Sequence, residues 1–389
     1  MASSKKSQKG FLIIISAVFF FLFEMAEMFP QEEGAQVNGF LYLVTPLVLL
    51  AAFFILNIEN APSRAIEQKY LLLFSWVIVG IYLSSLLNGG ITAAFQTKSQ
   101  YITVLLPLLA LWGTSSTNST TFDRWLIAMG IIFVGLSIYY FINRPFHIVE
   151  EMISRNNGAY TLLYLLPFIL CFKKSSLRIG GLVVTFMALL FSMKRGGLVA
   201  FAIAALVYGL VYNICVNKKR IRIGSFILSV IVVAGLLYLF VYFDELTDNI
   251  LSVRLQSMED DGGSGRMDIY QVVWSHIKQS SFFELLFGHG WNAVRQNCGI
   301  NASAHNDFLE VLYDFGIVVF LLYLAFFIEF FKVAFRMIKK HSFYAAPVCC
   351  SLAMLFISSM VSHIVIYPQY AIILGLFLGL ISNRINQEE

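Results

Sequence analysis

Three polar residues that can hold or move protons stand together at the edge of a long apolar run, in the stretch SAHNDFLEVLYDFGIVVF. They are His305, Asn306 and Asp307. Polar side chains at a membrane boundary cost desolvation energy unless they are hydrogen-bonded or hydrated. A chain this apolar needs a reason to carry them there, and a neutral imidazole among them can accept a proton or a hydrogen bond.

The residues around His305 predict a helix that continues into the apolar run. Asn301 or Ser303 can cap this helix, which places His305 in its first turn. Because a helix N-terminus disfavours an imidazolium, His305 should be largely neutral and able to accept a proton. The alternative is a boundary histidine that the backbone satisfies. One helix face then carries Phe308, Leu309 and Leu312, and a different face carries Asp307, Glu310 and Asp314.

A second polar group is the cation pair in FSMKRGGLVAF, where two predicted helices meet on the outer side. Lys194 and Arg195 run against the tendency of cations to remain on the cytoplasmic side, so they too need a reason. Gly196 and Gly197 leave backbone amides accessible, and a cation pair at a helix N-terminus makes a good anion site. Snorkelling of both side chains to lipid headgroups explains the pair equally well.

Arg266 and a glycine-rich turn, GHGW, form the third group. Taken alone, Arg266 is best explained as an exposed interfacial cation that pairs with lipid phosphate. Gly288 and Gly290 indicate a tight turn around His289, which by itself is only a structural signal.

The composition identifies the class of protein. Of the 389 residues, 58% are hydrophobic and 13% are charged, and the mean hydropathy is +0.75. A soluble chain is nearer half apolar and a quarter charged, so this is a polytopic membrane protein. The net charge of +4 does not point to a nucleic-acid partner, because Lys and Arg here set topology. The five cysteines predict no disulfide framework, and no motif suggests a metal or another cofactor.

The predicted fold is all-α, with about twelve transmembrane helices and one long outer loop. Residues 1–243 hold nine helices, residues 244–313 form the loop, and residues 314–389 hold three helices. The predicted segments are approximately 11–29, 38–57, 69–88, 98–115, 123–142, 158–173, 177–194, 196–216, 222–243, 314–333, 344–362 and 365–383.

Lys and Arg clusters precede the first helix and follow helices six, eight and ten, in KKSQK, KKSSLR, KKRIR and KVAFRMIKK. This distribution predicts that both termini are cytoplasmic and that the long loop faces outward. Within the loop, Met267, Tyr270, Trp274 and Ile277 recur at helical spacing, which predicts an amphipathic helix at the interface. Ser264 is the expected N-cap of that helix.

The order of these motifs resembles the O-antigen ligase and O-antigen polymerase family of bacterial envelope glycosyltransferases. The likeness covers roughly residues 180–335, and HNDFLEVLYDFGI is its most specific part. The segment GSGRMDIY followed by FGHGW also fits the family pattern. The match at MKRGG is looser, because the family often has Ser directly before the Arg, where this chain has Lys194.

The resemblance implies a lipid-linked sugar transferase with a GT-C-like membrane architecture, which needs neither a metal nor a nucleotide sugar. The donor would be a glycan on a polyprenyl diphosphate, most simply undecaprenyl diphosphate. By position, His305 would be catalytic, and Asp307 would orient it or substitute for it. Arg195 and Arg266 would contact the diphosphate, with Lys194 beside them. The supporting residues would be Gly288, Gly290, Asn306 and Glu310.

The resemblance also places the enzyme in the cytoplasmic (inner) membrane of a bacterium, with its site facing the periplasm or the cell exterior. It would act in the synthesis of a surface polysaccharide such as lipopolysaccharide or capsule. Its partners would be membrane lipid, the lipid-linked glycan, a flippase and a chain-length regulator. The assignment is chemically sensible, since arginines stabilise a diphosphate leaving group and a neutral histidine activates a hydroxyl.

Two acceptors compete within the family. A polymerase adds the glycan to another lipid-linked repeat unit, whereas a ligase adds it to lipid A-core or to a protein. The modest outer loop without an extra domain favours the polymerase. Outside the family, a transporter or flippase remains an alternative, but such proteins place their charges near the midplane rather than at one face. A scaffold without catalysis would leave His305 dispensable.

Overall fold

The computed structural model describes residues 69–96, 119–143, 158–192, 195–216, 265–300, 302–362 and 368–387, together with residue 111 and parts of 13–25. Within these ranges the regular elements are helices, and no strand occurs. The predicted segments 38–57 and 222–243, and nearly all of 98–115, lie outside the described residues. The same holds for Lys194, Ser264 and Asn301.

Eight of the predicted apolar segments coincide with helices of the structure. They are α3 (Lys69–Gln96), α5 (Ser119–Asn143), α7 (Gly158–Leu170), α8 (Ser175–Ser192), α9 (Arg195–Cys215), α15 (Asp307–Lys339), α16 (Ala345–Val361) and α17 (Pro368–Gln387). The loop adds three helices, α12 (Arg266–Gln279), α13 (Phe282–Phe287) and α14 (Ala293–Asn297).

Five of the described helices are long and apolar enough to cross a membrane, namely α3, α5, α8, α9 and α15. The apolar helices α7, α16 and α17 are shorter. In α7 nearly every side chain is buried, which is the pattern of a helix enclosed by other helices rather than one facing lipid. The chain is therefore a helical, polytopic membrane protein in its described part. The count of twelve spans and the GT-C-like architecture stay predictions.

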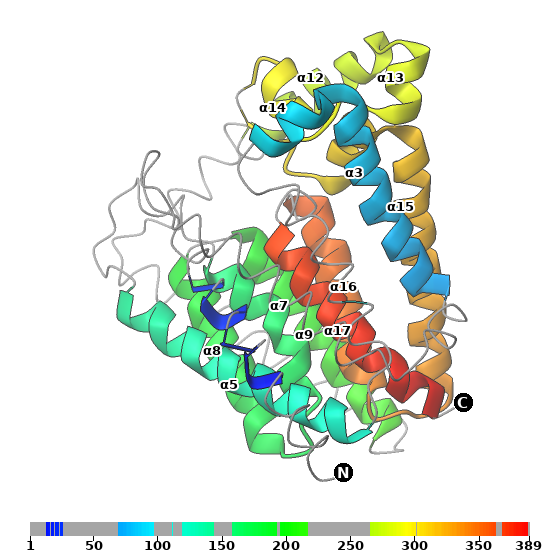
Figure 1. Cartoon of the computed structure of the whole chain (residues 1–389). Coiled ribbons are helices and arrows are strands. Elements are labelled where there is room, and N and C mark those ends of the chain that lie inside the picture. The colour runs from blue at the N-terminus through cyan, green and yellow to red at the C-terminus, as the bar shows by residue number, and fades with distance from the viewer. Residues whose placement is uncertain are drawn as a thin grey trace.

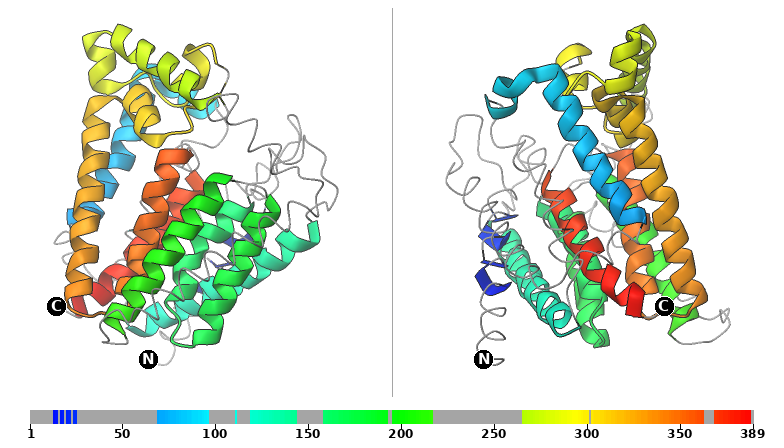
Figure 2. Two further views of the ribbon diagram at one scale, coloured as in Figure 1. Left: turned by 180° about the vertical axis from the view of Figure 1, so that it is seen from behind. Right: turned by 45° about the vertical axis from the view of Figure 1, so that its right-hand side comes forward.

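The loop helices α12, α13 and α14 gather at one end of the molecule, beside the ends of α3 and α15 (Figure 1). Two pairs of helices provide much of the packing: α3 runs along α15, and α9 runs along α16, as the two views in Figure 2 also show. The C-terminal helix α17 finishes at the opposite end of the molecule (Figure 1).

Small residues and aromatic rings explain why α3 and α15 pack closely. Gly80 lies so near Val319 that a Cβ on Gly80 would sit 2.7 Å from the Val319 Cγ2. Farther along, Tyr70 stacks on Phe330 with ring centroids 5.9 Å apart. Close approach at a small residue is the usual way in which helices associate in lipid. The pair forms a firm support for the loop helices above it.

The start of α15 corrects the sequence prediction. Asn306, rather than Asn301 or Ser303, is the N-cap, because its side chain accepts a hydrogen bond from Leu309 N. His305 therefore precedes the helix instead of lying in its first turn. The helix begins at Asp307 and is interrupted at Gly316, where φ is 81°. The sequence placed the start of the tenth span near this interruption.

The prediction of a helix here is confirmed by α12, whose apolar residues lie partly at the surface and partly in a small core. Met267 is 55% exposed and Trp274 is 47% exposed, whereas Val273 and Ile277 are buried. Val273 and Ile277 pack into a small core shared with Val294, Ala304 and other residues of the loop. The helix therefore turns its β-branched residues toward its neighbours in the loop and leaves the larger side chains at the surface.

Candidate active site

His305 lies in the irregular segment between α14 and α15, with its backbone in the left-handed region at φ 52°. This conformation is uncommon for a residue with a side chain, so neighbouring bonds must hold it. Immediately before it, the Ala304 N–H donates to Glu310 Oε2 at 2.7 Å. Ala304 and Glu310 are both fully buried, so this hydrogen bond is sheltered from water.

Asn306 holds the other side of His305. Its Oδ1 accepts from Leu309 N at 3.2 Å, which starts α15. Its Nδ2 donates to the Met360 carbonyl at 3.3 Å, which ties the segment to the last turn of α16. The Asn306 side chain thus caps α15 and bonds it to α16, so Asn306 helps to position the neighbouring His305.

The three carboxyl groups on the first turns of α15 point into the protein. Asp307, Glu310 and Asp314 are all fully buried. Asp307 Oδ2 accepts from the Tyr323 hydroxyl at 3.4 Å, and Asp314 Oδ1 accepts from Val294 N at 2.9 Å. The shared face predicted for the three residues is confirmed, and it is the inward one. Asp307 is thus hydrogen-bonded inside the protein, and its part in catalysis stays a prediction.

The turn at residues 288–290 fits against the interruption in α15. Gly288, Gly290 and Gly316 all have positive φ values, and a Cβ on Gly288 would collide with the Asp314 carbonyl. Gly290 N donates to that same carbonyl at 2.7 Å. Asn88 on α3 donates from Nδ2 to the Gly288 carbonyl at 3.1 Å. The glycines allow two backbones to meet, and the turn thereby fixes the loop on the α3–α15 pair.

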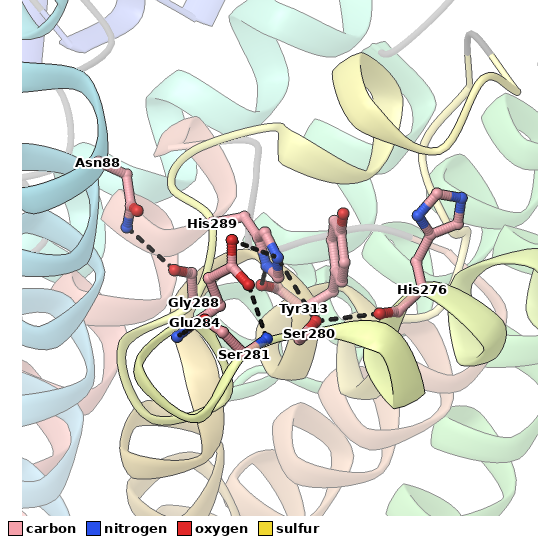
Figure 3. Close-up of polar contacts among 8 residues, drawn as sticks. All are labelled: Asn88, His276, Ser280, Ser281, Glu284, Gly288, His289 and Tyr313. Carbon is pink, nitrogen blue, oxygen red and sulfur yellow. Dashed lines mark hydrogen bonds and ion pairs between the residues drawn. The ribbon is translucent and has the colours of Figure 1, made fainter.

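His289 sits within this turn in a network of polar contacts (Figure 3). Its ring stacks on Tyr313 with centroids 4.1 Å apart, and its Nδ1 lies 3.1 Å from the Tyr313 carbonyl. Its Nε2 lies 3.4 Å from Ser280 Oγ and 3.9 Å from Glu284 Oε1 (Figure 3). The network joins the end of α12, the start of α13 and α15, so His289 serves the structure of the loop.

Glu284 is the charged member of that network and completes a capping box at the start of α13. Its Oε2 accepts from Ser281 N at 2.7 Å, and Ser281 Oγ accepts from Glu284 N at 3.4 Å. The hydrogen bonds from Ser281, together with the nearby His289, lower the pKa of the Glu284 carboxyl below its ordinary value. The short helix is therefore held at its start by an ionised carboxylate.

Arg195 is the first residue of α9, as the sequence predicted. Its side chain and Lys194 lie outside the described part of the structure. The adjacent Gly196 lies against the end of α16, since a Cβ there would be 3.3 Å from the Val361 Cγ2. On the next residue, Gly197, a Cβ would lie 3.4 Å from the ring of Tyr160. The glycines keep the start of α9 close to its neighbours.

Arg266 is the first residue of α12 and is partly exposed. Gly265 precedes it with φ 68° and serves as the N-cap, without a side-chain cap bond. One turn farther on, the Tyr270 hydroxyl donates to the His305 carbonyl at 3.5 Å. The start of α12 thus lies about one helical turn from the His305 segment.

These contacts bring the predicted residues to a common region. The end of α16 contacts two segments. The Met360 carbonyl accepts from Asn306, next to His305, and Val361 lies against Gly196, next to Arg195. Tyr270 connects α12, the helix that begins at Arg266, to the His305 carbonyl. The His305 segment therefore bonds to the end of α16, which the start of α9 contacts, and to Tyr270, one turn into α12. The start of a helix attracts an anion, because its amides and dipole favour negative charge.

Among the described residues, no group of three His, Cys, Asp or Glu side chains is arranged to hold a metal ion. One oxygen of each carboxyl group nearest His305 accepts from a backbone or hydroxyl donor of the protein.

A known protein family matches the part of the chain that carries these residues. Residues 180–324 match the O-antigen ligase family. The match confirms the resemblance seen in the sequence and contains Arg195, Arg266 and His305. An O-antigen ligase match indicates a glycosyltransferase-like membrane enzyme that acts in O-antigen processing. No curated protein matches the chain.

Within the O-antigen ligase stretch and beside it, sequence reasoning missed several residues that position the site. Tyr270 was assigned to a buried stripe, Met360 and Val361 were ordinary helix residues, and Asn88 ended a predicted span. Met360 takes part through its backbone carbonyl, which no sequence pattern marks. Asn88 did offer a signal, because an amide at the end of an apolar run often caps a neighbouring segment.

Proposed function

We propose that the chain is a polysaccharide polymerase that moves a glycan from a polyprenyl diphosphate, most simply undecaprenyl diphosphate, to a sugar hydroxyl of another lipid-linked repeat unit. The observation that carries the proposal is that the His305 segment bonds both to the end of α16, which the start of α9 contacts, and to Tyr270, one turn into α12. A diphosphate at this place would face Arg195, Arg266 and two helix N-termini.

The reaction proposed for this geometry is a single displacement. His305 accepts the proton of the acceptor hydroxyl as its oxygen forms a bond to the anomeric carbon of the donor sugar. The bond from that carbon to the diphosphate oxygen breaks, and the configuration inverts. Arg195 and Arg266, with Lys194, stabilise the charge that develops on the departing polyprenyl diphosphate. Asp307, Glu310 and Asn306 hold the segment that carries His305.

The proposed setting is the cytoplasmic membrane of a bacterium, with the site on the outward side and both termini in the cytoplasm. The Lys and Arg distribution supports this orientation. A flippase that delivers the lipid-linked unit and a regulator of chain length are proposed partners. Their surfaces are not specified by the described residues.

A ligase is the second candidate, and the matched family's own description, O-antigen ligase, favours it. The donor and the three site residues would be the same, and only the acceptor would differ. A ligase would transfer the finished glycan to lipid A-core or to a protein. The modest length of the predicted outer loop, residues 244–313, supports the polymerase, because such a loop leaves little room for a separate domain that could bind a large acceptor.

A complementation experiment tests the proposal. Cells that lack the gene receive the wild-type chain, His305→Ala, Arg195→Ala or Arg266→Ala at equal membrane levels, and the surface glycan is resolved by length. The polymerase proposal expects a ladder from the wild type and a single repeat unit on the anchor from each variant. Long chains that remain on the carrier lipid would identify a ligase instead. Full activity in all three variants would reject both forms of the proposal.

A further inference from the structure

Arg178 is a buried cation far from the site just described. It lies on the first turn of α8 and is only 6% exposed. Its neighbours are Tyr212, at the last turns of α9, and Phe343, in the turn between α15 and α16. Since the start of α9 meets the end of α16 near His305, Arg178 lies at the opposite end of α9 from the candidate active site.

The contacts of Arg178 leave half of its guanidinium without a polar partner. Nη2 donates to the Tyr212 hydroxyl at 2.9 Å, and the guanidinium carbon lies 4.5 Å from the centre of the Tyr212 ring and 5.6 Å from that of Phe343. Nη1 is buried and makes no hydrogen bond. No carboxylate of the described residues pairs with Arg178.

This arrangement calls for an anion. An arginine keeps its charge at all ordinary pH values, and a buried charge is costly unless it is paired and hydrogen-bonded. Two aromatic rings offset part of that cost through cation–π contacts, but they supply no acceptor for Nη1. A phosphate group would do so, because its oxygens match the fork of guanidinium donors.

The surrounding residues favour the same ligand. Lys173 and Lys174 are exposed and come directly before α8, and the segment FKKSSLRI contains no acid. The facing turn, KKHSFY at residues 339–344, contains none either. The first amides of α8, an 18-residue helix, point toward the same place, and a helix N-terminus attracts phosphate. Cations and helix amides thus surround Arg178 on both elements that meet there.

The exposed apolar residues beside this cluster indicate where the phosphate comes from. Leu177 is 46% exposed and Ile179 is 58% exposed, on either side of Arg178 in a helix long enough to cross a membrane. Acyl chains would cover these side chains while the headgroup phosphate meets the cations. Basic clusters at the ends of spanning helices on the cytoplasmic side are typical sites for anionic lipid.

We propose that Arg178, Lys173 and Lys174 form a binding site for the phosphate group of an anionic phospholipid, at the end of the molecule opposite His305. The bound lipid completes the pairing of Arg178 and joins α8 to the end of α9 and the turn after α15. The site is independent of glycan transfer and is tested without any measurement of activity.

The test measures thermal unfolding of the full-length chain in a neutral detergent, with phosphatidylglycerol, phosphatidylcholine or inorganic phosphate added. The wild type should be stabilised by phosphatidylglycerol and not by phosphatidylcholine, and its affinity should fall roughly tenfold or more in Arg178→Met. Lys332→Gln serves as the control, because Lys332 is an exposed cation of α15 whose pairing with Glu329 is at the surface. It should respond like the wild type.

Arg178→Met also distinguishes a lipid-binding role of Arg178 from a purely structural role. Without lipid, the variant should unfold at the same temperature as the wild type or higher, because an apolar side chain replaces an unpaired buried charge. Stabilisation of the wild type by inorganic phosphate as strong as by phosphatidylglycerol would assign the site to free phosphate and reject the lipid. Equal binding of phosphatidylglycerol by Arg178→Met and the wild type would overturn the proposal.

Discussion

At the scale of single residues, the structure separates the residue proposed to do chemistry from the residues that hold it. His305 has a left-handed backbone, and the bonds next to it come from Ala304, Asn306 and Tyr270. A strained backbone persists only where its surroundings over-determine it, and such positions cluster at functional sites. The acidic residues after His305, which looked like candidate proton carriers, are buried and occupied in this support.

Glu310 provides a direct test of that support. Glu310→Ala leaves the buried N–H of Ala304 without its acceptor, which should cost about 1–3 kcal/mol of unfolding free energy and lower glycan transfer. Glu310→Gln keeps a carbonyl oxygen in place, so it should lose less unfolding free energy and less glycan transfer than Glu310→Ala. Thermal unfolding and transfer assays of the two variants measure this. Equal behaviour of the two variants would show that the bond to Ala304 N does not support the segment.

Glu284 predicts a pH dependence of the loop. Its pKa in the folded chain is lowered from an ordinary value of 4.5, chiefly by hydrogen bonds from Ser281. A group with a lowered pKa stabilises the fold fully above its ordinary pKa, and this stabilisation is lost as the pH falls through the folded value. The protection of amides at the start of α13 against exchange, relative to their intrinsic exchange rates at each pH, should therefore decrease below about pH 4.5 in the wild type.

In Glu284→Gln the carboxyl that titrates is gone, so exchange at the start of α13 should show a much weaker dependence on pH in the acidic range. If Glu284→Gln loosens in acid as much as the wild type does, a group other than Glu284 causes the pH dependence.

At the scale of elements, the decisive contact is the turn at residues 288–290 against the interruption in α15. Ser84 and Asn88 of α3 donate to the carbonyls of Phe287 and Gly288 at the start of the turn, and Ser84 also donates to the Asp314 carbonyl of α15 at 3.2 Å. Here α15 is interrupted at Gly316, the turn at residues 288–290 packs against the interruption, and α3 holds the turn by hydrogen bonds. The motif thus couples the loop that carries Arg266 to the helix that follows His305.

Gly288→Ala should damage this coupling. The new Cβ would meet the Asp314 carbonyl at a positive φ, and the backbone would have to shift, so we expect a loss above about 1 kcal/mol and reduced transfer. Gly180→Ala is the matched control, because no atom lies within 4 Å of its Cβ position in α8. There alanine should be neutral, or stabilising by about 0.5–1 kcal/mol.

Thermal unfolding of both glycine variants in detergent measures the contrast. A Gly288→Ala protein as stable and active as Gly180→Ala would mean that the turn does not need to approach α15 closely.

The elements also show what a sequence can and cannot predict. Apolar length alone located eight helices, and most of their ends to within a few residues, because each needs a long apolar run. These are α3, α5, α7, α8, α9, α15, α16 and α17. The helix start at Asn306 was missed, since Asn301, Ser303 and Asn306 are all good caps and only tertiary contacts choose among them. The packing of Val273 against other loop residues was not predicted, because the apolar stripe seen in the sequence runs through Met267, Tyr270, Trp274 and Ile277.

At the scale of the whole molecule, the candidate site is assembled from segments far apart in the chain. Arg195 and His305 could be marked as candidates from the sequence, because cations at an outer boundary and a polar cluster beside an apolar run are unusual. Arg266 was selected only by the family resemblance. Their common location around the end of α16 could not be predicted. It depends on the Met360 carbonyl and on contacts of Val361, which carry no signature in sequence.

The two ends of the molecule are suited to different ligands. One end gathers the loop helices, His305 and the starts of α9 and α12, and the other carries Arg178 and the basic turns that contain no acid. An enzyme that takes its lipid-linked donor at one face of a membrane needs such polarity, with chemistry at one boundary and anchoring cations at the other.

The most direct test of this account uses the purified chain, a labelled repeat unit on undecaprenyl diphosphate and separate measurements of donor binding and glycan transfer. The account predicts that His305→Ala binds the donor like the wild type but transfers about 100-fold more slowly or worse, as expected for loss of a general base. Arg195→Ala and Arg266→Ala should weaken donor binding as well. Transfer by His305→Ala at the wild-type rate would contradict the central claim, because the site would then lack its proposed base.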